Sequence, residues 1–499
     1  GAHSHPYTTK SSMSESPHSP YPQLAAHQKP NKTRTNMSRE DPLKAEKDFS
    51  ATLDEQMPLI AQIPDYKNAV DRYLVLEKQI RQLSDLALSK RVLTTIVDTL
   101  VAHGDWAYLN ELIAVLLKKH GQLKTSIQVM IQHVIAQLGK LSNSDESQLA
   151  LKISLIDTIR TITDKKIFVE VERAEASRLL AEIYLSQKHD LDTATEILCE
   201  LQVETYSLMP FETKIEYILQ QMELTLRKKD YAQAKILGRK ILLKTLKGFA
   251  RADELKATYL GYLLQINKHE NDYITVVKNS LLLAEIPHVK ALPNHADLLV
   301  SIVYYVILSP FDNYQSDLIH NIKQNPLITK TVDPKILRLL EIFTNSELIQ
   351  WASLDGEYRT DYFAKSDVFA SNKTNNDNLQ NRVIEHNLRI VNKFYLFIQL
   401  RRLAVLLNVG EREAETYVSD MVNKGMILAK INRPKGVIKF EKLQHGTAAG
   451  AANVSSNSEN INDLLNSWIY DVDSLLQEVD SIGHLINKEE MMHGIKQKA

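Results

Sequence analysis

Hydrophobic residues in the first two thirds of the chain recur at intervals of three and four positions. Proline is absent between Pro64 and Pro210, and glycine occurs in that stretch only at Gly104, Gly121 and Gly139. Because proline costs about 3 kcal/mol inside a helix, this pattern predicts consecutive amphipathic helices. Two examples of the spacing are the sets Leu109, Leu112, Ile113, Leu116, Leu117 and Ile127, Met130, Ile131, Val134, Ile135.

A repeated turn divides these helices at a step of about 40 residues. An aspartate followed by a large apolar residue opens a helix at Asp105, Asp190, Asp230 and Asp272, and the first interval is two repeats long. Such an aspartate can cap the helix by accepting a hydrogen bond from an unpaired backbone N–H. The pattern predicts a solenoid related to tetratricopeptide repeats over residues 37–350, and an irregular helical domain is the alternative.

The fourth position after each of these aspartates is small or aliphatic. A small residue there, beside the large residue that follows the aspartate, would let neighbouring helices pack closely. These four positions are Leu109, Ala194, Ala234 and Val276.

The next part of the chain predicts a loop and then a small mixed domain. Residues 351–378 lack a periodic pattern and are expected to form an exposed loop. Residues 379–442 predict three helices and a β-hairpin, which is the winged-helix plan. Gly410 is expected to end the second helix and Gly425 the third, because glycine tolerates the left-handed conformation. The expected helices cover 379–396, 398–409 and 411–425, and the strands cover 426–432 and 437–442.

The charges of this domain disfavour nucleic-acid binding. Its third helix carries Glu411, Glu413, Glu415 and Asp420, which would repel phosphates. The basic residues of the hairpin are more consistent with a solvated turn or an acidic protein neighbour. The exposed edge of the hairpin could pair with a strand of a neighbouring subunit. The predicted wing interface consists of Met426, Leu428, Lys430, Val437 and Lys439.

An uninterrupted heptad pattern lies near the C-terminus, within residues 461–495. Its apolar residues alternate between steps of four and three, which keeps one stripe of a helix facing a partner. Residues 443–460, rich in Ala, Gly, Ser and Asn, are a predicted linker that lets this helix leave its own domain and join a bundle of subunits. The seam consists of Ile461, Leu465, Trp468, Val472, Leu475, Val479, Ile482 and Ile486.

Composition narrows the class of protein. The chain has 499 residues and a net charge of −1, so no bulk field draws it to nucleic acid or anionic lipid. No run of 18 apolar residues predicts a membrane span, and no secretory signal is visible. Residues 1–36 are polar and proline-containing and are interpreted as a disordered leader or tag. Cys199 is the single cysteine, which fits a reducing cytosol or nucleus.

Catalytic motifs are missing from the sequence, so no enzyme, cofactor or metal site is predicted. Neither a G-x-x-x-x-G-K-[ST] phosphate loop nor an H-E-x-x-H motif occurs, and the one H-x-H, His3 to His5, lies in the leader. Cys199 stands among apolar and acidic residues and is predicted to be a buried structural thiol. Packing or polar contacts with subunits are expected for His386 and His484. A solvated helix end or a contact patch is expected for Glu489 and Glu490.

Six long stretches between Met37 and the C-terminus resemble a known family. A helical-repeat array fused to a winged helix is the PCI module, which the proteasome lid, the signalosome and a translation-initiation complex share. The chain closely resembles fungal members of the non-ATPase, PCI-domain subunit-five family of the 26S proteasome lid. The stretches are KIFVEVERA (166–174), ATEILCELQVETY (194–206), YYVILSPFDNYQSDLIH (304–320), RVIEHNLRIV (382–391), YVSDMVNKGMILAKINRP (417–434) and IGHLINKEEMMHGI (482–495).

This resemblance implies a non-catalytic scaffold that supports ubiquitin-dependent protein degradation in cytoplasm and nucleus. The winged helices of such subunits line up in a horseshoe, and their C-terminal helices gather into a bundle. The solenoid is implied to radiate outward and contact the lid deubiquitylase subunit, the ATPase ring and the outer ring of the core particle. The alternatives are a subunit of the signalosome, either dedicated to it or shared with the lid, and a subunit of another PCI complex in translation or RNA export.

Overall fold

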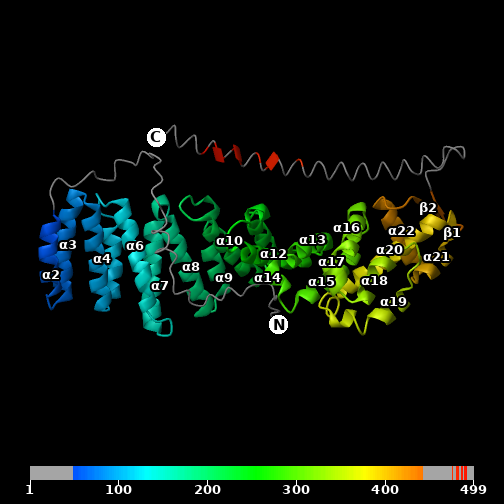
Figure 1. Ribbon diagram of the computed structural model, residues 1–499, viewed down its shortest axis with the longest axis horizontal. Coiled ribbons are helices and arrows are strands. Elements are labelled where there is room, and N and C mark those ends of the chain that lie inside the picture. Colours follow the sequence, from blue (N-terminus) through cyan, green and yellow to red (C-terminus); the bar gives the residue numbers. More distant parts are fainter. Residues whose placement is uncertain are drawn as a thin grey trace. The chain divides into compact units, whose positions relative to one another are not determined.

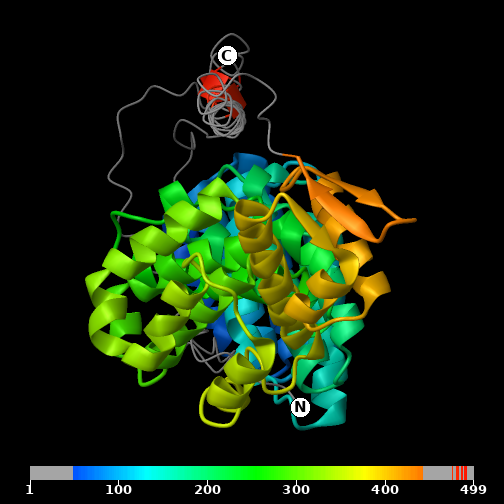
Figure 2. The same ribbon diagram turned by 90° about the vertical axis from the view of Figure 1, so that its right-hand side faces the viewer.

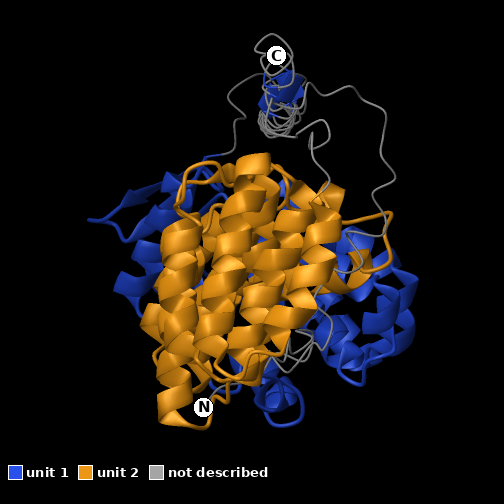
Figure 3. Cartoon of the chain, turned by 90° about the vertical axis from the view of Figure 1, so that its left-hand side faces the viewer, with its two compact units in different colours: residues 1–7, 263–499 blue, residues 8–262 orange. Residues whose placement is uncertain are grey.

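The computed structural model describes residues 49–441 and a set of positions near the C-terminus. The described chain is predominantly helical, with one small sheet between residues 397 and 440, so the predicted fold class is confirmed (Figure 1). Its residues divide at Tyr262 into an N-terminal unit, 49–262, and a C-terminal unit from Leu263 onward (Figure 3). The described C-terminal positions are Leu475, Val479, Asp480, Ile482, Leu485, Ile486, Lys488, Glu489 and Met491.

Helices of the N-terminal unit alternate between two rows. Helix α4 packs against α6 and α6 against α8 in one row, while α5 packs against α7 in the other. This is the arrangement of a solenoid, in which each helix pair buries its apolar face against the next pair. The helices are α2 (Ser50–Ala61), α3 (Tyr66–Leu83), α4 (Leu86–Ala102), α5 (Trp106–Leu116), α6 (Lys124–Gln137), α7 (Glu146–Thr163), α8 (Glu170–Ser186), α9 (Leu191–Cys199), α10 (Phe211–Arg227) and α11 (Tyr231–Gly238).

Shorter elements complete this unit. The single-turn 3-10 helices are η1 (Leu138–Lys140), η2 (Ile167–Val169), η3 (Val203–Thr205) and η4 (Leu243–Thr245). Helix α12 (Ala252–His269) continues across the division between the two units.

Aspartate caps begin several of the predicted repeats. Asp105, Asp190 and Asp230 each accept a hydrogen bond from the backbone N–H three residues later, at 3.2, 3.1 and 3.2 Å. At Asp272 the carboxylate instead accepts a hydrogen bond from the hydroxyl of Thr275, at 2.7 Å. The predicted side-chain cap is therefore confirmed at three of the four turns.

The double interval between Asp105 and Asp190 contains one more capped helix. Asp145 accepts a hydrogen bond from the N–H of Ser147 at 3.1 Å and begins α7. Glu146 follows it in place of a large apolar residue, so the sequence pattern did not identify this repeat. With Asp145 included, the aspartates recur at every repeat from α5 to α13 (Tyr273–Ala284).

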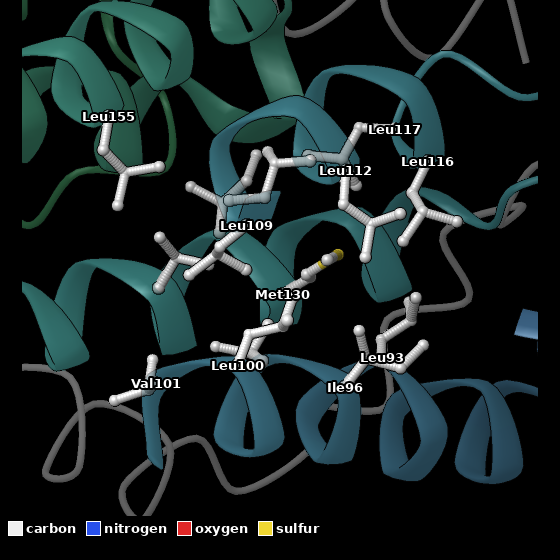
Figure 4. Packing of buried hydrophobic residues seen from close by; sticks show 14 of the residues in the cluster. Leu93, Ile96, Leu100, Val101, Leu109, Leu112, Leu116, Leu117, Met130 and Leu155 are labelled. Carbon is white, nitrogen blue, oxygen red and sulfur yellow. The ribbon is translucent and has the colours of Figure 1, made fainter. Parts of the chain in front are cut away.

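The predicted close-packing positions are fully buried. Figure 4 shows how Leu93 and Leu100 of α4, Leu109 of α5 and Met130 of α6 converge on one core. Burying a side chain of this size contributes about 1.5–3 kcal/mol of transfer free energy. The four positions that follow the capping aspartates, Leu109, Ala194, Ala234 and Val276, are all 0 % exposed.

The C-terminal unit is built around α15, whose residues Leu298 to Leu308 are mostly buried. This helix packs against α13, α18 and α20. The elements before the sheet are α13 (Tyr273–Ala284), α14 (Pro287–Lys290), α15 (His295–Leu308), α16 (Asn313–Gln324), α17 (Pro326–Thr331), α18 (Pro334–Ile342), α19 (Trp351–Tyr358), η5 (Phe363–Lys365) and α20 (Lys373–Phe394).

The predicted exposed loop over 351–378 is wrong. Helix α19, the turn η5 and the first residues of α20 occupy this segment. Aromatic contacts hold it in the core: Phe363 and Phe369 are buried, and their rings lie 5.5 and 5.2 Å from the ring of Tyr304 on α15. These aromatic residues are too widely spaced to form a helical or strand period, which explains the error.

Asparagine side chains explain why the start of α20 has the composition of a loop. Asn372 caps the helix by accepting a hydrogen bond from the N–H of Asn375 at 3.1 Å. Asn375 and Asn376 donate to the carbonyls of Val368 and Phe369, both at 2.8 Å. The polar residues therefore pair with the backbone of the preceding turn, and the helix begins at Lys373 instead of near 379.

A buried asparagine fixes the segment before α19 to α20. The side chain of Asn387 accepts a hydrogen bond from the N–H of Ile349 at 2.7 Å and donates one to the carbonyl of the same residue at 2.8 Å. Both residues are buried. The amide thus pairs with both polar groups of one peptide segment, as a neighbouring strand would.

We expect Asn387→Ala to loosen this attachment. The substitution leaves the N–H and carbonyl of Ile349 buried without partners, at roughly 1–3 kcal/mol for each group. Native-state hydrogen exchange should show faster exchange across 346–358 and little change in α4 to α8. The matched control is Asn378→Ala, at a half-buried position on the same helix. Unchanged protection of 346–358 in Asn387→Ala would contradict the role of this amide.

Candidate functional site

The winged helix follows α20 and contains a third strand that the sequence did not predict. Residues Phe397–Gln399 form β1, so the helix expected over 398–409 begins only at Leu400. The sheet has the order β1-β3-β2 and both pairings are antiparallel (Figure 2). Strand β1 is too short for an alternating pattern to be visible in the sequence. The elements are β1 (Phe397–Gln399), α21 (Leu400–Leu407), α22 (Glu411–Asn423), β2 (Ala429–Asn432) and β3 (Val437–Phe440).

Left-handed residues end the two helices. After α22, Gly425 has φ +72° and the N–H of Met426 donates to the carbonyl of Met421 at 3.0 Å, which is a Schellman ending. After α21 the left-handed residue is Asn408, with φ 55°. The prediction that Gly410 ends α21 is therefore wrong, and this glycine is the N-cap residue of α22.

One face of the sheet packs on the helices and the other is exposed. Ile398, Ile438 and Phe440 are buried against Leu403 and Val418. Because side chains alternate along a strand, the residues between them lie on the outer face. The sheet thus has a fixed inner side, which determines the side chains available to a partner.

The predicted wing residues fall into two groups. Leu428, Lys430, Val437 and Lys439 share the outer face by strand register, and the N–H of Glu441 extends the ladder by donating to the carbonyl of Leu428 at 2.8 Å. Met426 differs, because it lies between α22 and β2 and packs partly against the core. The sequence missed Phe397, which is 59 % exposed and pairs in register with Lys439.

The sequence predicted a two-stranded wing with an exposed edge for pairing, but the sheet has three strands. Strand β3 lies in the centre, so the backbone of Val437 and Lys439 already pairs with β1 on one side and β2 on the other. Strand addition could use only the outer edge of β1 or of β2. Val437 and Lys439 can therefore contact a partner only through their side chains.

Charges on the wing are largely matched within the domain. Lys430 lies 3.0 Å from a carboxylate oxygen of Glu441, and Arg433 lies 2.8 Å from one of Glu415 on α22. The ammonium of Lys439 lies 5.8 Å from the centre of the Phe397 ring. The acidic helix and the basic hairpin thus offset each other, which gives phosphate groups no continuous basic track.

Exposed apolar side chains gather in the sequence around β1. Phe394 ends α20, Leu396 and Phe397 follow it, and all three are more than half exposed. Leu396 belongs to the ladder, because its carbonyl accepts a hydrogen bond from the N–H of Phe440 at 2.9 Å. Three large exposed apolar residues within four positions are typical of a protein-contact surface.

The described part of the heptad seam is helical and exposed. Leu475, Val479, Ile482 and Ile486 are 59, 54, 54 and 52 % exposed. The remaining seam positions, Ile461, Leu465, Trp468 and Val472, lie outside the described residues. Large apolar residues that repeat at four and three positions and stay exposed require a partner to be buried.

His386 is the histidine candidate that lies within the described residues. His386 is buried, its Nε2 lies 2.8 Å from the carbonyl oxygen of Glu347, and burial lowers the pKa of this imidazole. The packing expected for His386 is confirmed, because this buried side chain pairs with the backbone of its own chain. His484 and Glu490 lie outside the described residues, whereas Glu489 is exposed on the C-terminal helix.

Cys199, at the end of α9, is half-buried, and burial raises the pKa of its thiol to about 11. The thiolate is the nucleophilic form, so this cysteine is poorly reactive at neutral pH. Within the described ranges, no group of three His, Cys, Asp or Glu side chains could hold a metal ion. In the same ranges, no helix is long and apolar enough to span a bilayer.

Family comparisons cover each part of this architecture. A model described as PSMD12/CSN4, N-terminal, matches residues 68–291, the PCI domain model matches 356–442, and the model of the 26S proteasome regulatory subunit RPN5 C-terminal domain matches 462–494. The second match contains the winged helix, and the third contains the heptad seam from Leu465 to Ile486.

Full-length relatives agree with these matches. The chain is 43 % identical to the 26S proteasome regulatory subunit RPN5 of Saccharomyces cerevisiae, over 93 % of this chain and 100 % of the relative. It is 35 % identical to the 26S proteasome regulatory subunit rpn501 of Schizosaccharomyces pombe, over 86 % of this chain and 92 % of the relative. It is 33 % identical to the 26S proteasome non-ATPase regulatory subunit 12 of Dictyostelium discoideum, over 86 % of this chain and 90 % of the relative. The chain belongs to the RPN5/PSMD12 family of PCI-domain regulatory subunits of the 26S proteasome.

Proposed function

We propose that the chain is a non-catalytic scaffold subunit of the 26S proteasome lid, where it supports ubiquitin-dependent protein degradation by holding other subunits together. The observation that carries this proposal is the exposed seam from Leu475 to Ile486, in the segment matched by the RPN5 C-terminal domain model. A helix with this stripe gains stability by joining other helices. These residues contribute to function by binding the helices of other subunits.

The energy available from the seam is large enough to drive assembly. Each seam residue contributes roughly 1.5–3 kcal/mol when fully buried. The entropy lost on ordering the helix and joining the subunits offsets much of this gain. Several residues must therefore be buried together, which makes association depend on the whole seam.

The winged helix supplies a second surface for the same role. Its outer sheet face, with Phe397 and Leu428 exposed among lysines, is suited to another PCI subunit. We infer that the deubiquitylase subunit, the ATPase ring and the outer ring of the core particle are further neighbours of the solenoid. From the family's role in the proteasome, we infer that the chain is located in the cytoplasm and the nucleus.

Membership of the signalosome is the second candidate. It is favoured by the N-terminal family model, whose description joins PSMD12 with CSN4. Affinity purification of the chain from its native host, followed by mass spectrometry, tests both proposals. Recovery of lid subunits with the ATPase ring and core particle supports the lid, whereas recovery of signalosome subunits alone would move the function to that complex.

The double substitution Trp468→Ala with Leu475→Ala should weaken lid assembly. It removes two large side chains from the seam, so incorporation into the lid, measured on native gels, should fall at least about tenfold. Circular dichroism of the purified chain should remain unchanged, because the solenoid does not depend on the seam. The matched control is Lys488→Ala with Glu489→Ala, at two exposed positions of the same helix. Normal incorporation of the seam variant into the lid would contradict the scaffold proposal.

The double substitution Phe397→Ser with Leu428→Ser should reduce co-purification of neighbouring PCI subunits several-fold. Both changes remove apolar area from the outer sheet face and leave its hydrogen-bonded ladder intact. Leu59→Ser with Val115→Ser is the control, because these residues are similarly exposed but lie in the N-terminal unit. Equal recovery of PCI subunits with both variants would show that the wing face is not an interface.

A further inference from the structure

A strongly basic segment lies in the N-terminal unit. Residues 227–251 contain nine Lys and Arg residues and a single acidic residue, Asp230, whereas the whole chain has a net charge of −1. The segment comprises the end of α10, helix α11, the turn η4 and the approach to α12. Like charges at this density repel one another, so the segment stores unfavourable energy that an acidic partner would relieve.

Some of these cations already have carboxylate partners. Arg227 pairs with Glu223 at 2.6 Å, and Lys240 pairs with Glu204 at 2.9 Å. Arg251 contacts Glu216. The last two pairs connect the segments after α11 with η3 and with α10, and these pairs leave the cations of the next turn unmatched.

Three cations remain beside the end of α11. Arg239 follows the helix directly, and Lys244 and Lys247 lie in the turn that leads to α12. All three are exposed, and no carboxylate among the described residues forms an ion pair with them. Their charges are therefore available to a partner.

The turn that presents these cations is firmly anchored. Ile241 and Leu246 are buried, and the hydroxyl of Tyr259 donates to the carbonyls of Gly238 and Ile241 at 2.8 and 3.2 Å. A partner would bind a surface that is already ordered, which reduces the entropy lost on binding. The anchoring also makes the exposure of Leu242, at 58 %, a fixed feature of the turn.

Further apolar residues lie on the loop before α10 and at the first position of that helix. Leu208 and Phe211 are exposed, and the ring of Phe211 meets that of Phe249 edge to face, with centroids 6.3 Å apart. The ion pair of Lys240 with Glu204 also connects the two loops. Exposed apolar side chains and unpaired cations therefore occur together on two neighbouring loops of the solenoid.

We propose that these two loops form a docking surface for an acidic polypeptide segment of another protein that also carries apolar side chains. The surface, called here the basic turn surface, consists of Leu208, Phe211, Arg239, Leu242, Lys244 and Lys247. Carboxylates of the segment pair with the three cations, and its apolar side chains cover the leucines and the phenylalanine.

Other polyanions fit this surface less well. A nucleic-acid backbone needs a continuous basic track, and Glu204, Glu212 and Glu216 lie on the adjoining elements. A polypeptide can place its carboxylates only where the cations are and use apolar contacts elsewhere. The observations therefore favour an acidic and apolar polypeptide.

The test uses the purified full chain and a fluorescein-labelled synthetic peptide in which glutamates and leucines recur at helical spacing. Fluorescence anisotropy should show binding that weakens as salt rises. The variant Arg239→Glu/Lys244→Glu/Lys247→Glu should weaken binding at least about tenfold, and Leu242→Ser should weaken it several-fold. The control variant Lys67→Glu/Lys78→Glu/Lys118→Glu changes the net charge equally at other exposed sites and should bind within about twofold of the original chain.

Three results would overturn the proposal. The first is no measurable binding of the peptide by the folded chain. The second is an equal loss of binding in the control variant, which would reduce the effect to net charge. The third is equally tight binding of poly-glutamate or single-stranded DNA, which would make the surface a general polyanion site. None of these results bears on the lid assignment, because that rests on the C-terminal seam and the winged helix.

Discussion

Close packing between successive helix pairs is the constraint on which the solenoid depends. An aspartate fixes the start of a helix, and four residues later a small or aliphatic side chain is completely buried, as at Ala194 and Ala234. A larger residue there would hold neighbouring helices apart, at a cost of typically 1–3 kcal/mol for overpacking. Since each pair is buried mainly by its neighbours, the loops between pairs are free to vary and to bind.

In the C-terminal unit, buried polar side chains take over part of this positioning. Asn375 and Asn387 lie on α20 and hydrogen-bond to the backbone of segments that precede the helix, and His386 does the same through Glu347. An unpaired amide in the interior costs about 1–3 kcal/mol, so these contacts define one position of α20. The winged helix packs directly on α20, so the position of α20 also determines where the exposed sheet face lies.

The sequence predicted most where a single local rule decides the structure. The aspartate caps and the glycine at Gly425 each needed only neighbouring residues. It failed where distant contacts decide: β1 is a strand only because β3 pairs with it, and 351–378 is ordered by aromatic contacts with α15. Asp145 was missed because Glu146 follows it, although the cap itself is the same. The outer face of the wing was only partly predicted, since Phe397 joins it through that unforeseen strand.

A net charge near zero conceals how unevenly this chain distributes its charges. On the winged helix, the carboxylates of Glu415 and Glu441 neutralise the basic hairpin, so the outer sheet face is left with apolar contacts as its main source of binding energy. In the segment 227–251, cations outnumber the carboxylates that can pair with them, so positive charge remains at the turn after α11. Interactions between exposed charges fall off over about 8–10 Å at physiological salt, so a partner responds to the local excess and not to the total. One chain can therefore offer a neutral apolar surface in one unit and a basic surface in the other, and the two select different neighbours.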